Sequence, residues 1–144
     1  TDAVYIDKVE AFNNGMQMVS RIGSRIPLYC SGVGKAMMAR MEDWEAEEIW
    51  NTSDICALTE HTITDHEEFK KELEQIRQQG YALDNEENQI GVRCIPCSLK
   101  VPMGDTKYAF SISAPVSRMD DGRIRELADY VLGTAKEMAE NLAR

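Results

Sequence analysis

The sequence predicts an α+β fold in which helices cover an antiparallel β-sheet. Three strand-like segments follow one another late in the chain, at residues 81–83, 91–99 and 106–114, and short connections join them. Strands joined in this way must be antiparallel neighbours, because a parallel pair needs a crossover of about a dozen residues or more. Segments with helical periodicity precede and follow these strands, so we expect the helices to form separate layers on the faces of the sheet.

Composition places the chain among ordinary soluble domains. Its 144 residues suit one domain, and 43% are hydrophobic and 28% charged. The formal net charge of −9 argues against direct contact with a nucleic-acid backbone. The four cysteines are too few for a disulfide framework, which favours a reducing, cytoplasmic setting. No apolar run reaches the length of about 18 residues that a membrane span needs. The chain begins at Thr1 rather than Met, so we expect a domain cut from a longer protein.

The first third of the chain predicts a hairpin followed by two helices. Residues 3–10 alternate through Val4 and Ile6 before the rhythm is lost, and residues 16–22 alternate as a second strand. The Asn-Asn-Gly at residues 13–15 is typical of a tight turn between them. Residues 35–41 carry apolar side chains at helical spacing, and residues 42–50 predict a short acidic helix.

Two later helices have recognisable ends. Thr64 and Glu67 have the spacing of a capping box, which predicts a helix start, and Gly80 predicts the end of that helix. The last helix is expected to begin after Asp120 or Asp121. The apolar stripes that these helices would bury are Phe69, Leu73 and Ile76 for the first, and Ile124, Leu127, Val131, Met138 and Leu142 for the second.

A glycine-rich segment before the first helix has some features of a phosphate-binding loop but fails its pattern. Tyr29 stands where the first glycine is needed, and Ala36 where a magnesium-binding hydroxyl is needed. Met37 occupies the third glycine position of a dinucleotide fingerprint, so we expect no nucleotide. Two interpretations remain for Gly32 and Val33. In the first, their N–H groups start a helix and hold a small anion such as a carboxylate. In the second, the small residues allow a close contact between the helix and the sheet.

Residues 106–114 predict a strand with two chemically different faces. One face is bulky and apolar, and the other is small and carries Ser111 and Ser113. These serines either face water or form the floor of a pocket in which their hydroxyls hold a polar ligand.

The cysteine and histidine pattern predicts no catalytic residues, no metal site and no cofactor. In an extended strand, the Cα atoms of Cys94 and Cys97 would lie about 10 Å apart at about 3.3 Å per residue. Their side chains would also point to opposite faces, so the CxxC spacing does not indicate a redox pair. Cys56, His61 and His66 add no standard zinc spacing.

Five stretches share their order and spacing with a known family. They are RIGSRIPLY (21–29), SGVGKA (31–36), IRQQGYALDNEE (76–87), GVRCI (91–95) and AFSISAP (109–115). Each is weak alone, but together they make nearly the whole chain resemble the C-terminal effector-binding domain of IclR-type bacterial transcriptional regulators.

The resemblance implies a GAF-like fold, with a central antiparallel sheet of about six strands and helices on its faces. It implies that residues 1–144 form a single non-enzymatic effector-binding and oligomerisation domain. A winged helix-turn-helix DNA-binding domain would precede it and is absent from this chain. It also implies a homodimer or homotetramer that contacts DNA only through that missing domain and makes no membrane contact. The effector would be a small organic acid, similar to glyoxylate, a sugar acid or an aromatic acid.

Carried over position by position, the family's effector pocket falls on Gly32, Val33, Asp84, Cys94, Ser111 and Ser113. Asp84 has two interpretations: its carboxylate accepts a hydrogen bond from a ligand hydroxyl, or it caps its own loop at residues 84–87.

Two other functions compete with effector binding. An enzyme of the same fold would use Cys94 as a redox or nucleophilic thiol, and it would need a lowered thiol pKa. A ligand-free dimerisation module would have an occluded pocket.

Overall fold

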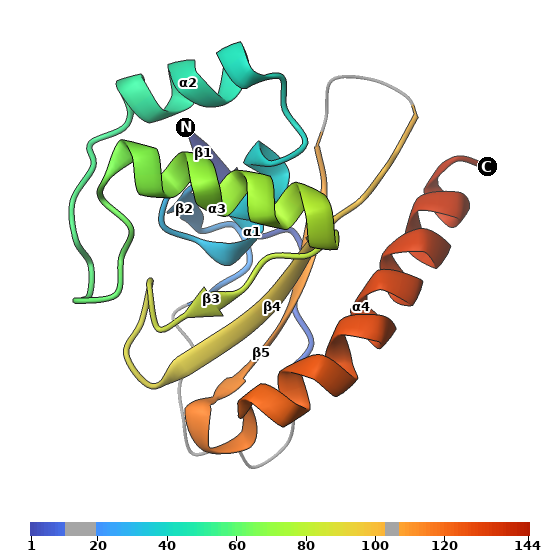
Figure 1. The fold of residues 1–144 in the computed structure, drawn as a ribbon. Helices are drawn as coiled ribbons and strands as arrows, with labels where there is room; N and C mark the ends of the chain where they lie inside the picture. Colours follow the sequence, from blue (N-terminus) through green and yellow to red (C-terminus); the bar gives the residue numbers. More distant parts are fainter. Residues whose placement is uncertain (11–19, 103–106) are drawn as a thin grey trace.

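A three-stranded antiparallel sheet with helices on both faces forms the centre of the computed structural model, which describes residues 1–10, 20–102 and 107–144 (Figure 1). The strands lie in the order β3 (Asp84–Asn85), β4 (Val92–Ser98) and β5 (Ala109–Pro115), and a 3-10 turn, η1 (Val116–Arg118), follows β5. The strand that we predicted at residues 81–83 begins at Asp84. This residue therefore lies in the sheet, opposite Cys94, rather than in a polar loop.

A separate two-stranded sheet pairs β1 (Asp2–Val4) with β2 (Arg25–Pro27). The prediction of one sheet with about six strands is therefore not met, because the described residues hold five strands in two sheets. The strand predicted at 3–10 is limited to β1. Of the strand predicted at 16–22, residues 20–22 are not in a strand, and residues 16–19 and the turn at 13–15 lie outside the described residues.

The four helices of the described residues are α1 (Gly32–Met38), α2 (Asp43–Thr52), α3 (His66–Gln79) and α4 (Asp121–Leu142). Helix α1 starts earlier than predicted, because the Ser31 hydroxyl caps its first turn. The Thr64 capping box is wrong by one residue, since the Asp65 carboxylate is the N-cap of α3. Gly80 ends α3 with a φ of 90°, and Asp120 caps α4, as predicted. None of the helices described is long and apolar enough to cross a membrane.

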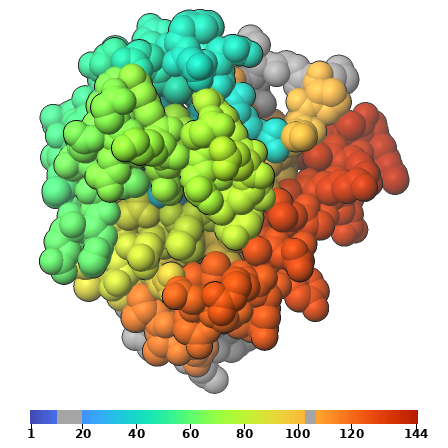
Figure 2. Space-filling view, in the orientation of Figure 1, coloured from blue at the N-terminus to red at the C-terminus, as the bar shows by residue number. Residues whose placement is uncertain are grey.

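The two faces of the central sheet carry separate apolar cores. Helices α1, α2 and α3 form one core, which buries the predicted α3 stripe, and α2 and α3 lie side by side on the surface in Figure 2. Helix α4 packs on the opposite face, against Ile95 and Cys97. Its buried stripe continues through Ala135 and Ala139, because this spacing keeps one helical face, whereas Met138 and Leu142 are exposed.

Candidate functional site

Four of the predicted site residues share one face of the central sheet. Asp84 lies opposite Cys94, and Cys94 lies opposite Ser113, so the three form a row across β3, β4 and β5. Ser111 lies opposite Pro96, two residues along each strand, and therefore points to the same face. Ser111 is half-buried and Ser113 is exposed, so this end of the row is open to solvent.

The start of α1 packs directly on this row. A Cβ atom at Gly32 would lie 2.7 Å from Cγ of Pro96 and 3.1 Å from Cβ of Asp84, so the position needs glycine. The close-contact interpretation of Gly32 is therefore confirmed. The hydroxyl oxygen of Ser31 accepts a hydrogen bond from the N–H of Gly34. The N–H groups of Gly32 and Val33 have no hydrogen-bond partner among the described residues. The same contact that requires glycine places the start of α1, which carries these two N–H groups, against the row.

Asp84 is a buried carboxyl group, only 5% exposed. Its Oδ1 accepts a hydrogen bond of 2.9 Å from the N–H of Glu87, which confirms the loop-cap interpretation. Burial raises the pKa of Asp84 to about 6, and the negative charge of Glu87 acts in the same direction, against the Glu87 N–H and the charge of Lys35.

The thiol of Cys94 has a raised pKa, whereas a nucleophilic thiol needs a lowered one. Burial raises its pKa to about 12, and the charge of Asp84 acts in the same direction, whereas the nearby hydroxyls of Ser113 and Ser111 act against this rise. A thiol with this pKa stays protonated near neutral pH, which contradicts the enzyme alternative. Cys97 points into the core under α4, so the CxxC cysteines do face opposite sides, as strand alternation predicts.

Lys35, which the sequence patterns did not single out, bonds to the chain on both sides of Asp84. Its side chain is fully buried, and its Nζ donates to Glu72 Oε1, Glu87 Oε1 and the Leu83 carbonyl oxygen, each at 2.8 Å. Burial lowers the pKa of Lys35, but the charges of Glu87 and Glu72 outweigh this effect and the net pKa is raised. A lysine within an otherwise apolar helical segment was the available signal.

Two surface cavities lie away from these residues. One, of about 370 Å³, lies between α2 and α3 and is lined by Trp50, His66 and Phe69 among others. The other, of about 470 Å³, lies near the end of α1 and includes Arg40 and Tyr108. Within the described ranges, no group of three or more His, Cys, Asp or Glu side chains is placed to hold a metal ion.

Comparisons with known proteins connect this geometry to a family. The family described as "Bacterial transcriptional regulator IclR C-terminal" matches residues 1–140. The transcriptional repressor IclR of Escherichia coli (strain K12) is 32% identical over 137 residues, which cover 95% of this chain and 50% of that protein. The transcriptional regulator KdgR of the same strain is 34% identical over 139 residues, which cover 96% of this chain and 52% of that protein.

A solved structure agrees. The crystal structure of the Thermotoga maritima IclR has a TM-score of 0.91 and 35% sequence identity, and the match covers 99% of this chain and 57% of that one. The chain spans about half the length of the curated relatives named above. These relatives regulate transcription and are not enzymes, which confirms the prediction of a non-enzymatic domain. The chain therefore belongs to the IclR family of bacterial transcriptional regulators and corresponds to the C-terminal part of these proteins.

Proposed function

We propose that residues 1–144 form one effector-binding and oligomerisation domain of a cytoplasmic transcriptional regulator. The effector is a small organic acid of the glyoxylate, sugar-acid or aromatic-acid type. One observation supports this proposal most strongly: uncharged hydrogen-bond donors lie close together on one face of the central sheet. They are the N–H groups of Gly32 and Val33 and the hydroxyls of Ser111 and Ser113. Such a set suits an anion that also carries other polar atoms.

Each predicted site residue has a role in this proposal. The effector carboxylate accepts from the N–H groups of Gly32 and Val33, and the serine hydroxyls bind its other end. Asp84 uses one oxygen to cap its loop, and its other oxygen accepts from a hydroxyl of the effector. Cys94, which stays protonated, lines the floor between them.

Regulation would pass through the oligomer. Effector binding favours one arrangement of the subunits of a homodimer or homotetramer, which changes the spacing of the DNA-binding domains that precede this domain. The domain itself contacts neither DNA nor membrane, in keeping with its net charge of −9.

Calorimetric titration with glyoxylate, galacturonate and benzoate tests the site. A hydrogen bond to a charged group contributes about 1.5–3 kcal/mol, so Ser111→Ala or Ser113→Ala should weaken the binding acid about 10- to 150-fold. Stability without the acid should change by less than about 1 kcal/mol. Ser117→Ala, on the exposed η1 turn, is the matched control and should bind as the unmodified protein does. Unchanged affinity in both test variants would refute the assignment of this face. Native mass spectrometry of the purified protein would name a co-purified acid.

A further inference from the structure

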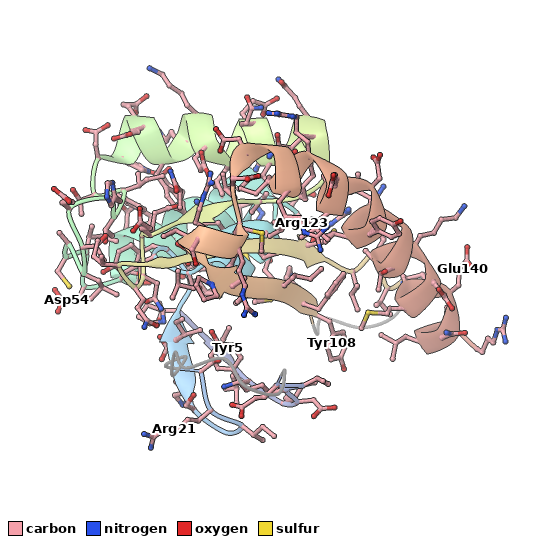
Figure 3. All side chains as sticks on the ribbon, turned by 90° about the horizontal axis from the view of Figure 1, so that it is seen from below. Tyr5, Arg21, Asp54, Tyr108, Arg123 and Glu140 are labelled. Atoms are coloured by element: carbon pink, nitrogen blue, oxygen red, sulfur yellow. The ribbon has the colours of Figure 1, made fainter. Side chains whose placement is uncertain are left out.

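The cavity of about 470 Å³ at the C-terminal end of α1 is separate from the proposed effector site. Its lining comes from two parts of the chain: Met37 and Arg40 at the end of α1, and residues within 98–102 and 107–108 where β4 ends and β5 begins. Figure 3 shows Tyr108, one of these residues, at the end of the central sheet nearer the C-terminal part of α4. The start of α1 lies about 10 Å away, because its seven residues rise by about 1.5 Å each.

The lining of this cavity is positively charged, although the chain has 25 acidic and only 16 basic side chains. Arg40, Lys100 and Lys107 contribute to it, and no Asp or Glu of the described residues does. Lys107 Nζ lies 3.8 Å from Glu45 Oε1, whereas Arg40 and Lys100 form no ion pair with any residue that the structure describes. Like charges around one cavity repel each other, so an anion between them would lower the electrostatic energy.

Ser98 adds an uncharged donor to the cavity. It is the last residue of β4 and only 6% exposed. Its hydroxyl forms no hydrogen bond within the described part of the chain, yet it is not among the side-chain atoms that are closed off from solvent without a partner. The hydroxyl therefore opens into the cavity that the residue lines. A buried hydroxyl normally has a hydrogen-bond partner, and a bound anion would accept from this one.

Size and chemistry together define the class of ligand. A volume of about 470 Å³ lies within the range of about 300–1,000 Å³ that is usual for small-molecule sites. Met37, Leu99 and Val101 give the lining an apolar part, which suits an organic molecule better than a bare inorganic ion. The single charge of a monocarboxylic acid would balance only one of the three cations, so a ligand with more negative charge is favoured.

We propose that this cavity is a second binding site, which takes a small organic anion with two or more negative charges. Phosphate esters and polycarboxylates share this chemistry. Arg40, Lys100 and Lys107 would pair with the charged groups of the anion, and Ser98 would donate to one of its oxygens. The cavity shares no residue with the proposed effector site, so either proposal can fail without the other.

Calorimetric titration with citrate and with glucose 6-phosphate tests the site and separates the two sources of the anion. At least one of them should bind, with an affinity that falls as the salt concentration rises. Binding of citrate alone would identify a polycarboxylate site, and binding of glucose 6-phosphate alone would identify a phosphate-ester site. Binding of both would support the shared chemistry. No binding of either at millimolar concentration would overturn the proposal.

A charge-matched pair of double variants locates the bound anion. Arg40→Gln with Lys100→Gln should weaken binding about 2- to 30-fold, because an exposed ion pair contributes modestly and two such pairs are lost. Lys71→Gln with Arg118→Gln removes the same two charges from exposed positions outside the cavity and should bind as the unmodified protein does. Equal affinities of the two double variants would show attraction to the protein's overall charge and would overturn the site.

Ser98→Ala tests the uncharged donor separately. It should weaken the bound anion about 10- to 150-fold, since one hydrogen bond to a charged group is lost. Thermal melting of the same sample checks that this buried position still folds. If Ser98→Ala does not fold, the exposed charge variants decide the outcome alone. A folded Ser98→Ala protein with unchanged affinity would overturn donation by this hydroxyl.

Discussion

Replacing Lys35 with methionine removes the centre of a buried charge cluster. Methionine fills a similar volume but cannot donate, so the carboxylate of Glu87, whose side chain is only 7% exposed, loses its cation. The Leu83 carbonyl loses its donor at the same time. Removal of one partner from a buried ion pair destabilises a protein by about 3–5 kcal/mol. A domain is stable by only about 5–15 kcal/mol, so Lys35→Met should remove a large part of the free energy of unfolding.

Urea unfolding, followed by the fluorescence of the two tryptophans, measures this change. With a denaturant slope of about 2 kcal/mol per M, the midpoint should fall by about 1.5–2.5 M. The double variant Lys35→Met with Glu87→Gln should recover part of the loss, because it removes the uncompensated charge and keeps a side-chain acceptor for the Asn85 N–H. Lys70→Met is the matched surface control. Lys70 is half-exposed beside Glu47 and Glu67, so its loss should change stability by less than about 1 kcal/mol.

If Lys35→Met also lowers the free energy of unfolding by less than about 1 kcal/mol, the buried cluster around Lys35 does not stabilise the fold.

Three further predictions concern other parts of the molecule. The pKa of Asp84 is raised to about 6 in the folded state, so the stability of the protein relative to Asp84→Asn should be highest below about pH 4 and should fall as the pH rises through 6. Thermal melts across this pH range measure the difference, and a difference that does not change with pH would contradict the raised pKa of Asp84. Gly133→Ala should stabilise the protein by about 0.5–1 kcal/mol, because Gly133 lies within α4 and its new methyl group meets no neighbouring atom. Gly34→Ala should unfold the protein, because its Cβ would collide with the Leu28 carbonyl. Equal melting temperatures of the two variants would contradict this difference. The protein should self-associate at micromolar concentration in sedimentation, and Tyr130→Glu, on the exposed side of α4, should weaken this association; a strict monomer would contradict the regulatory mechanism.

Local patterns predicted those features that depend on neighbouring residues. Strand alternation placed Ser111 and Ser113 on one face of β5, and the Gly80 and Asp120 helix boundaries follow from capping preferences. The cap of α3 was displaced by one residue, because both Thr64 and Asp65 are good N-caps and only the tertiary position of the helix chooses between them.

Features that depend on distant pairing were beyond local patterns. The row of Asp84, Cys94 and Ser113 requires the register of three strands, which the resemblance anticipated but periodicity did not. The partners of Lys35 lie 37 and 52 residues away in sequence, so nothing local could identify them.

Chemical-shift mapping by NMR during titration with glyoxylate, galacturonate and benzoate locates a bound acid without any substitution, so it shows whether the acid binds where α1 meets the central sheet. We expect the largest shifts of backbone amides at Gly32, Val33, Cys94, Ser111 and Ser113. Shifts centred on Trp50 in the groove between α2 and α3, or on Tyr108 in the cavity beyond α1, would place the acid elsewhere and contradict it.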